Sequence, residues 1–397
     1  MSKKGIIVIG FLAIGFVALA QMVFDWTGIG SDSLRLVNTN VAVSYGFDAH
    51  PSFYSNNSRF FYFVTRTGLR YETSGGENRW NQQFSLTRPH MITNGEMVAV
   101  GETNGGRIIF VFDSSGPIFT ANLNNPVLGF SLNQAGYLSV ITQHENGYGI
   151  YVYNRHRNVE PLYSKRITQE ANPMVVPLAA EVSEDGRYIV IAYWDLNQDV
   201  TMVVDFRFIN QEDAPFGTYG LFTQKTFAGE TPLAMRFMAN NTLLLITDRQ
   251  IKLYSITGDE VQIEWSRELQ NYLDQIAFNG NNRFAYVAGP PAGADTNYAD
   301  PIGTVNIFDL NGLTGSFNIG RRGTHLSMGH NAVIVGADRY FHAVNIRGES
   351  LWHHNALHDV RDMLFLENTD TVLIAGPNRA YVWRRLRERD DVYVGVE

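Results

Sequence analysis

The chain has 397 residues, of which 13% are aromatic and 18% charged, and it carries a net charge of −8 and no cysteine. The lack of cysteine excludes disulfides, thiolate metal sites, a cysteine nucleophile and a lipid-modified cysteine. Because the basic residues are scattered, no broad basic surface is available to a phosphate backbone, and nucleic acid is not expected as a partner.

The N-terminus carries one long apolar segment. Lys3 and Lys4 precede Gly5–Phe24, twenty residues without a charge. As a helix this length spans roughly 30 Å, the thickness of a bilayer's hydrocarbon core. The lysines before the segment and Asp25 after it place the N-terminus in the cytoplasm and the rest outside. Residues 1–26 are therefore predicted to form a signal-anchor transmembrane helix.

A cleaved signal peptide is the competing interpretation of this segment. Ala18-Leu19-Ala20 before Gln21 has the small-x-small form of a signal peptidase site. The protein would then be secreted rather than held at the membrane as a single-pass protein. A buried soluble helix is a third interpretation, but the first two both place the remaining chain on the extracytoplasmic side.

One pattern recurs along the rest of the chain: a polar turn of Asn, Gly or Asp, followed at once by five to seven apolar or aromatic residues. The turns are marked by Asn57, Gly95, Gly136, Gly186, Asn241, Asn282, Asn331 and Asp370. A period of about 40 to 50 residues without a helical pattern is typical of the four-stranded blades of a β-propeller. The apolar run after each turn fits a second strand covered on both faces.

An alternating third strand and an outer strand with one bulky aromatic complete each unit. The expected outer-strand aromatics are Trp80, Phe119, Trp265, Phe317 and Trp352. First strands are expected near Pro51, His90, Val127, Val176, Leu233, Asp274, Thr324 and Val360. The fold class is therefore all-β, a propeller of about eight blades, with seven as the alternative.

The last unit has only three strands before the polar run RRLRERDD. Leu34–Val43, just after the hydrophobic segment, is otherwise unassigned and can supply the missing outer strand. That strand would join the two ends of the chain and leave no open sheet edge. The propeller is predicted to span residues 34–390.

The segments YSITGDEVQIEW from Tyr254 and VNIRGESLW from Val344 resemble the strand, glycine turn and tryptophan of quinoprotein-type propeller repeats. RYETSGGENRW from Arg70 and FDSSGPIF from Phe112 are weaker copies. The resemblance covers roughly residues 50–386, and WD40-type propellers are the other relatives by period, although their Gly-His and Trp-Asp signatures are absent.

Exported propellers of the quinoprotein-like type include cofactor-binding dehydrogenases and non-enzymatic scaffolds that assist outer-membrane protein assembly. The dehydrogenases are usually much longer and often carry paired cysteines, so the resemblance implies a scaffold. The assembly scaffolds are typically tethered through a lipidated cysteine, which this chain lacks.

In a propeller, the loops from second to third strands and those from blade to blade share one face, which is expected to carry the long connections and to bind. The longest is Ala288–Gly303, where Asp295, Asn297 and Asp300 offer oxygen atoms. A calcium site needs six to eight ligands, so a partner-binding loop and a plain surface insertion are the main alternatives.

Aromatic residues in the same set of loops form a predicted binding rim. These are Tyr148, Trp194 and Tyr298. Aromatic side chains dominate binding hot spots. The alternative is that each of them fills the core between blades.

His353, His354, His358, Asp359 and Asp362 form the densest group of possible zinc ligands. Alternation along a strand sends His353 and His354 to opposite faces, so no metal site is predicted. Hydrolase, phosphate-binding and dinucleotide motifs are absent from the sequence, and neither a cofactor nor a catalytic residue is assigned.

Together these observations predict a non-enzymatic extracytoplasmic binding or scaffold protein, held at the membrane by its N-terminal helix. Its loop face would bind a protein or an envelope component. The alternative is an exported propeller enzyme, either a quinone-cofactor oxidoreductase or a glycan-active hydrolase. A purely structural domain without a ligand is the third hypothesis.

Overall fold

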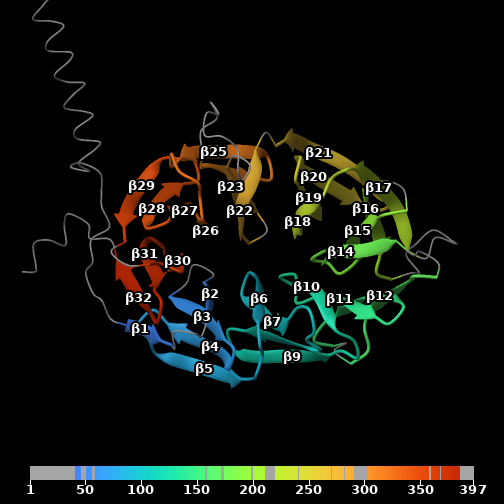
Figure 1. The fold of residues 1–397 in the computed structure, drawn as a ribbon, viewed down its shortest axis with the longest axis horizontal. Helices are drawn as coiled ribbons and strands as arrows, with labels where there is room; N and C mark the ends of the chain where they lie inside the picture. Colours follow the sequence, from blue (N-terminus) through green and yellow to red (C-terminus); the bar gives the residue numbers. More distant parts are fainter. Residues whose placement is uncertain are drawn as a thin grey trace, which may run out of the picture.

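The computed structural model describes residues 41–45, 51–55, 59–156, 159–170, 174–197, 200–210, 220–239, 241–269, 271–280, 282–289, 303–356, 359–366 and 368–384. All regular elements within these ranges are β-strands (Figure 1). No helix long and apolar enough to cross a membrane occurs among them. The predicted anchor at residues 1–26 lies outside the described residues.

The strands form eight antiparallel sheets of four strands each, arranged around a central axis (Figure 1). Blade 1 is β2 (Ser52–Tyr54), β3 (Phe60–Thr65), β4 (Gly68–Thr73) and β5 (Asn78–Gln83). Blade 2 is β6 (Pro89–Asn94), β7 (Met97–Glu102), β8 (Ile108–Asp113) and β9 (Gly116–Asn122). Blade 3 is β10 (Val127–Leu132), β11 (Leu138–His144), β12 (Gly147–Tyr153) and β13 (Tyr163–Thr168). Blade 4 is β14 (Val175–Val182), β15 (Tyr188–Asp195), β16 (Thr201–Phe208) and β17 (Leu221–Ala228).

The second half of the ring repeats this arrangement. Blade 5 is β18 (Pro232–Met238), β19 (Thr242–Thr247), β20 (Gln250–Thr257) and β21 (Glu260–Glu268). Blade 6 is β22 (Tyr272–Asn279), β23 (Arg283–Gly289), β24 (Thr304–Asp309) and β25 (Gly312–Asn318). Blade 7 is β26 (His325–Met328), β27 (Ala332–Ala337), β28 (Tyr340–Asn345) and β29 (Ser350–Asn355). Blade 8 is β30 (Asp362–Leu366), β31 (Asn368–Ala375), β32 (Arg379–Arg384) and β1 (Val41–Ser44). The eight-bladed prediction is confirmed, and the seven-bladed alternative is wrong.

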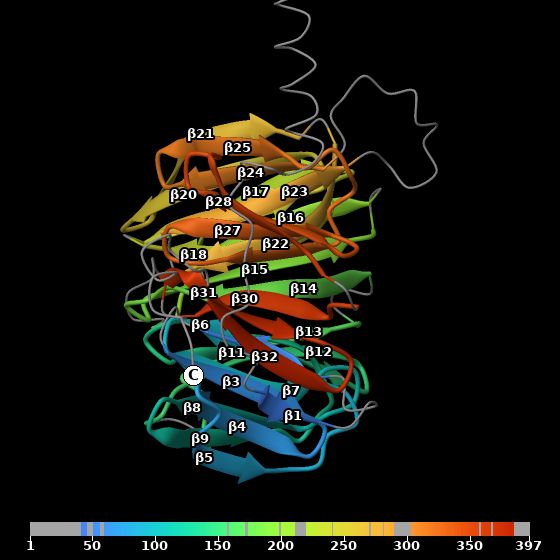
Figure 2. The same ribbon diagram turned by 90° about the vertical axis from the view of Figure 1, so that its left-hand side faces the viewer.

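The last blade is closed by the first described strand, as predicted. β1 runs antiparallel to β32, with Val43 opposite Ala380 and Ser44 opposite Arg379 (Figure 2). Val43 is 3% exposed and packs with Phe53 and other apolar residues of blade 1. This strand therefore completes blade 8 and contributes to the apolar layer that joins it to blade 1, while residues 34–40 of the predicted segment lie outside the described residues.

The second strands are buried on both faces, as their continuous apolar sequences predict. Every residue of β19 and of β27 is buried.

The polar turns before the second strands fit the prediction in most blades. The backbone is left-handed at Gly95, Gly136, Gly186 and Asn241. Asp370 was wrongly predicted to mark a turn: β30 ends at Leu366 and β31 already begins at Asn368, so Asp370 lies within the second strand.

All five predicted outer-strand aromatics lie in fourth strands. The three tryptophans among them link one blade to the next by hydrogen bonds. Each donates its indole N–H to a backbone carbonyl of the following blade. The pairs are Trp80 with Ser114 at 3.0 Å, Trp265 with Leu310 at 2.9 Å and Trp352 with Thr369 at 3.0 Å. Each indole thus satisfies its one donor while its ring packs in the layer between blades, where Trp352 is buried and Trp80 and Trp265 are half-buried.

Asparagine side chains make a second kind of blade-to-blade link at the start of the first hairpin. Asn94 donates to the carbonyl of Leu132 at 3.1 Å, and Asn133 donates to that of Ser183 at 2.8 Å. Asn279 makes the corresponding bond to Gly329. The sequence pattern predicted polar turns at these places but not these contacts between blades.

Because neighbouring strands alternate in direction, the connections lie on two faces. We call the face with the blade-to-blade connections and the second-to-third-strand turns the blade-connecting face, and the opposite one the hairpin face. The longest connection, between β23 and β24, belongs to the blade-connecting face as predicted. The long connection 209–220, between β16 and β17, belongs to the hairpin face, so the expectation that one face carries the long connections is wrong.

Candidate functional site

The structure places two of the predicted rim residues in different layers. Tyr148, on β12, is half-buried and packs in the apolar layer between blades 3 and 4. Trp194, on β15, is half-buried and packs in the layer between blades 4 and 5. The structure therefore does not bring the two side chains together, and their part in binding a partner stays a prediction.

The other predicted binding residues cannot be placed in the fold. Asp295, Asn297, Tyr298 and Asp300 lie outside the described residues, as does His358 of the predicted histidine group. Their roles stay predictions as well.

The remaining members of the histidine group are separated. His353 and His354 lie on opposite faces of β29, as strand alternation predicts, and His354 packs against Trp383 with 4.6 Å between ring centroids. Asp359 and Asp362 each lie within ion-pair distance of another partner, an arginine and a histidine respectively. Within the described ranges no group of three or more potential metal ligands occurs.

The densest set of buried charges lies between blades 3 and 4, around Asp205 of β16. This carboxylate is 1% exposed. It accepts hydrogen bonds from Lys165 at 3.1 Å and from Arg207 at 2.8 Å on one oxygen, and from Tyr193 at 2.9 Å and Gln224 at 2.8 Å on the other. Both oxygens are fully used, so the network joins two blades rather than offering a site to a ligand.

The pKa of Asp205 reflects this arrangement. Burial would raise it, but the positive charges of Lys165 and Arg207, helped by the hydrogen bond from Gln224, lower the pKa below the ordinary value for aspartate. The carboxylate is therefore ionised at neutral pH and balances cations that are themselves partly buried.

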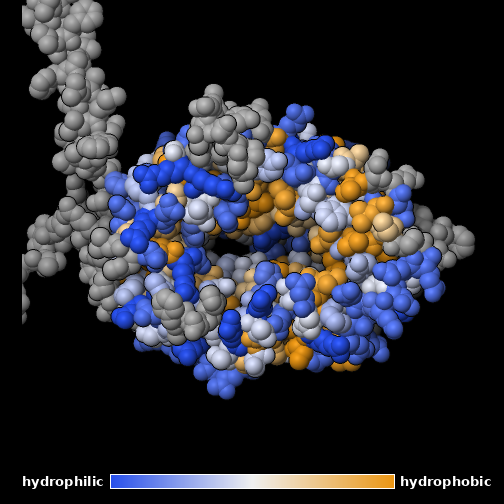
Figure 3. Space-filling view, viewed as in Figure 1, coloured by the Kyte–Doolittle hydropathy of each residue, from blue (hydrophilic) through white to orange (hydrophobic). Residues whose placement is uncertain are grey.

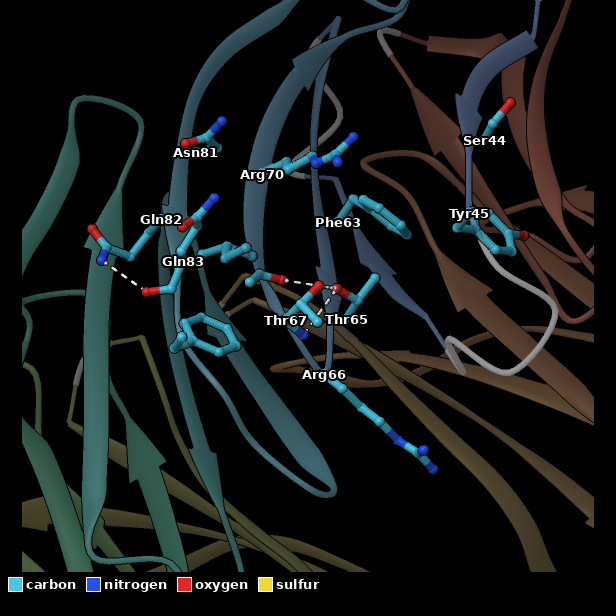
Figure 4. Close-up of a pocket in the computed structure, with 13 residues that line it drawn as sticks. Ser44, Tyr45, Phe63, Thr65, Arg66, Thr67, Arg70, Asn81, Gln82 and Gln83 are labelled. Atoms are coloured by element: carbon cyan, nitrogen blue, oxygen red, sulfur yellow. Dashed lines mark hydrogen bonds between the residues drawn. The ribbon is translucent and has the colours of Figure 1, made fainter.

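A groove of about 990 Å³ lies on the seam where the ring closes (Figure 4). We call it the seam groove. It is lined by Ser44, Tyr45, 65–70 and 81–84, together with Phe63. These residues belong to the end of β1, the turn between β3 and β4, and the outer strand β5. The groove therefore opens at the blade-connecting face, the face predicted to bind.

Part of the seam groove is lined by exposed polar residues of blade 1. Arg70, Asn81 and Gln83 are left exposed there.

The charged residues that line the seam groove are both arginines, Arg66 and Arg70. Arg70 lies 3.7 Å from the carboxylate of the buried Glu72, whose pKa is raised by burial against the opposing charge of Arg70. Arg66 is exposed and extends away from the strands (Figure 4). Tyr45 and Phe84, both half-buried, supply stacking surfaces, and the side-chain amides of β5 supply hydrogen-bonding groups. Sequence reasoning missed this site, because its lining comes from separate segments that only the folded ring brings together.

Comparison with known proteins identifies a family and a fold. A family model described as a family of unknown function, DUF5711, matches residues 47–382. No curated protein matches the chain. The C-terminal WD40 domain of Sif2 aligns with a TM-score of 0.58 at 9% identity, covering 90% of this chain and 99% of that one. Saccharomyces cerevisiae Sqt1 aligns with a TM-score of 0.53 at 10% identity, covering 89% of this chain and 99% of that one.

The structure of BamB from Moraxella catarrhalis also aligns, with a TM-score of 0.48, 14% identity, and coverage of 88% of this chain and 97% of that one. At these identities the similarities show the fold alone, and that fold is the β-propeller that the sequence predicted.

The Asp205 network generates a stability prediction. Asp205→Asn leaves Lys165 and Arg207 without their counter-charge and should lower the free energy of unfolding by about 3 kcal/mol in urea denaturation. Since folding lowers the pKa of Asp205, its ionised form stabilises the protein at neutral pH, and the gap to the variant should close only below about pH 4. Asp259→Asn, in an exposed turn, is the control, with an expected change within about 0.5 kcal/mol. Equal effects of the two substitutions would contradict the assignment.

Proposed function

Since the chain belongs to the DUF5711 family of unknown function, we propose its role from its own surface: an extracytoplasmic scaffold whose seam groove binds an acidic, extended segment of a partner protein. The proposal needs no catalytic residue and no cofactor.

The observation that supports it is the seam groove itself. Two arginines line a polar groove on the blade-connecting face, and its walls add side-chain amides and aromatic rings. Guanidinium groups bind carboxylates through charge-assisted, often two-pronged hydrogen bonds. Amide side chains of β5 can bond to the backbone of an extended segment, so carboxylates and backbone of the same segment would both be recognised.

A defined peptide tests the groove. A fluorescent peptide rich in Asp and Glu should bind the wild type at low salt, and its Asn and Gln counterpart should not. Arg66→Ala should weaken binding about tenfold in fluorescence anisotropy, the loss expected for one charge-assisted contact. Arg66 is the better choice for substitution, because changing Arg70 would also disturb Glu72.

Arg107→Ala is the matched control, since Arg107 is an exposed arginine on the same face in blade 2. Its affinity for the acidic peptide should equal that of the wild type. If Arg66→Ala and Arg107→Ala weaken binding equally, general surface charge and not the seam groove attracts the peptide.

The proposed location rests on the N-terminal segment, which anchors the chain with its propeller outside the cytoplasm. Because the natural chain has no cysteine, a single Ser85→Cys substitution creates one exposed thiol on the propeller. A membrane-impermeant maleimide should label this variant in intact cells whose outer envelope layers have been made permeable to the reagent. Ser2→Cys, on the other side of the apolar segment, should react only after lysis. A Ser85→Cys variant protected until lysis would contradict export.

A further inference from the structure

The central channel of the ring contains an arginine that has no hydrogen-bonding partner among the described residues. Arg236 projects from β18, the innermost strand of blade 5, and is half-buried. Its Nε is buried and unbonded, and its side chain makes no hydrogen bond or ion pair with a described residue. Its contact is with Phe278 of blade 6, whose ring centroid lies 4.8 Å from the guanidinium carbon. A guanidinium removed from bulk water without an acceptor is energetically unfavourable, and an anion would relieve this.

The ionisable groups that act electrostatically on Arg236 are Glu181, Tyr54 and Glu184. No ion pair joins any of them to Arg236. Burial raises the pKa of Glu181 to about 7, against the opposing hydrogen bond from Ser131 and the charge of Arg236. Burial also raises the pKa of Tyr54, which stays neutral and donates its hydroxyl to a backbone carbonyl. At neutral pH the Glu181 carboxyl is therefore protonated in part of the molecules.

The channel is narrow at the hairpin face. The Gln134 side chain, in the β10–β11 turn, lies against turns of two blades on opposite sides of the ring. A Cβ atom at Gly95 of blade 2 would lie 3.1 Å from it, and one at Gly280 of blade 6 would lie 3.4 Å from it. Figure 3 shows the axis hollowed, with a strongly hydrophilic patch on its inner wall and apolar patches around it. The arginine therefore lies on the wall of a hollow narrowed at one end.

We propose that this channel binds a small organic monoanion, whose carboxylate takes the unfilled hydrogen bonds of Arg236. One guanidinium can bind one carboxylate through two parallel hydrogen bonds, the bidentate geometry. A dianion such as phosphate is disfavoured because Glu181 and Glu184 lie in the same field. A protonated Glu181 can donate a further hydrogen bond to a bound carboxylate. The site is separate from the seam groove, so either can fail without the other.

Benzoate and propionate, each paired with its neutral amide, are the probes. Calorimetry on the full chain should show saturable binding of at least one carboxylate, while benzamide and propionamide should not compete. Arg236→Gln should weaken the affinity at least about tenfold, the loss expected for a charge-assisted pair. The same variant should melt no earlier than the wild type, because it removes a cation that lacks a partner.

Two further variants separate this site from general charge effects. Arg267→Gln removes a guanidinium that also packs on an aromatic ring, Phe308, but lies on the outer strand β21. It should bind the carboxylate as the wild type does. For the wild type, affinity should fall as the pH rises from about 6 to about 8, because ionised Glu181 repels the ligand. Glu181→Gln should remove this dependence.

The proposal is overturned if neither carboxylate binds the wild type, if the amides bind equally well, or if Arg236→Gln keeps the affinity of the wild type. If Arg236→Gln does not fold, Arg236→Lys provides the test. This variant keeps the positive charge but cannot make the bidentate contact. Its affinity for the carboxylate should fall severalfold, with the pH dependence unchanged. Unchanged affinity in Arg236→Lys would then contradict the proposed geometry.

Discussion

The structure depends on closure of the ring. A four-stranded sheet with two apolar faces is stable only when a neighbouring sheet covers each face. In a closed ring every blade has two such neighbours, whereas an open ring would expose apolar faces where the first and last blades fail to meet. Here one strand from the N-terminal part of the chain, β1, completes blade 8 and packs on blade 1. The tryptophan and asparagine hydrogen bonds also join neighbouring blades at other interfaces, where an indole or an amide of one blade donates to the backbone of the next.

Both candidate sites are consequences of this closure. The seam groove lies where the end of β1 meets the β3–β4 turn and β5 of blade 1. The channel exists because the innermost strands surround the axis, and Arg236 has no hydrogen-bonding partner there among the described residues. By contrast, the charges around Asp205 lie between two packed blades, and Lys165, Arg207 and Gln224 all donate to its carboxylate.

Much of the fold was predictable from the sequence, because its signals are local. Polar turns followed by apolar runs identified the blades, and the one bulky aromatic expected in each outer strand placed Trp80, Trp265 and Trp352 correctly in fourth strands. The closing strand was predictable from the missing fourth strand of the last unit. Asp370 was misplaced because a polar residue in a short hairpin resembles a turn, although the preceding strand ends earlier.

The sites were less predictable, because they depend on residues that are distant in sequence. Nothing local about Arg66 or Arg236 distinguishes them from the other arginines. Arg66 lines a groove because residues near 44 and 81–84 meet at the seam, and Arg236 faces a channel whose other walls come from blades 1, 4 and 6. Tyr148 and Trp194, chosen as loop aromatics, proved to pack in two different layers, since sequence position alone does not say which face of a blade a strand residue covers.

A disulfide across the closing strand tests the account most directly. Ser44 and Arg379 are paired and exposed, and directly opposed antiparallel residues lie about 4.5 to 5.5 Å apart, within disulfide range. In this cysteine-free chain, Ser44→Cys with Arg379→Cys should oxidise to an intramolecular disulfide, seen as a loss of both maleimide-reactive thiols. Ser44→Cys with Ser350→Cys, which joins β1 to the outer strand of blade 7, should keep both thiols reduced. If the first pair stays reactive under the same oxidation, the first and last strands do not close the ring, and the seam groove does not exist.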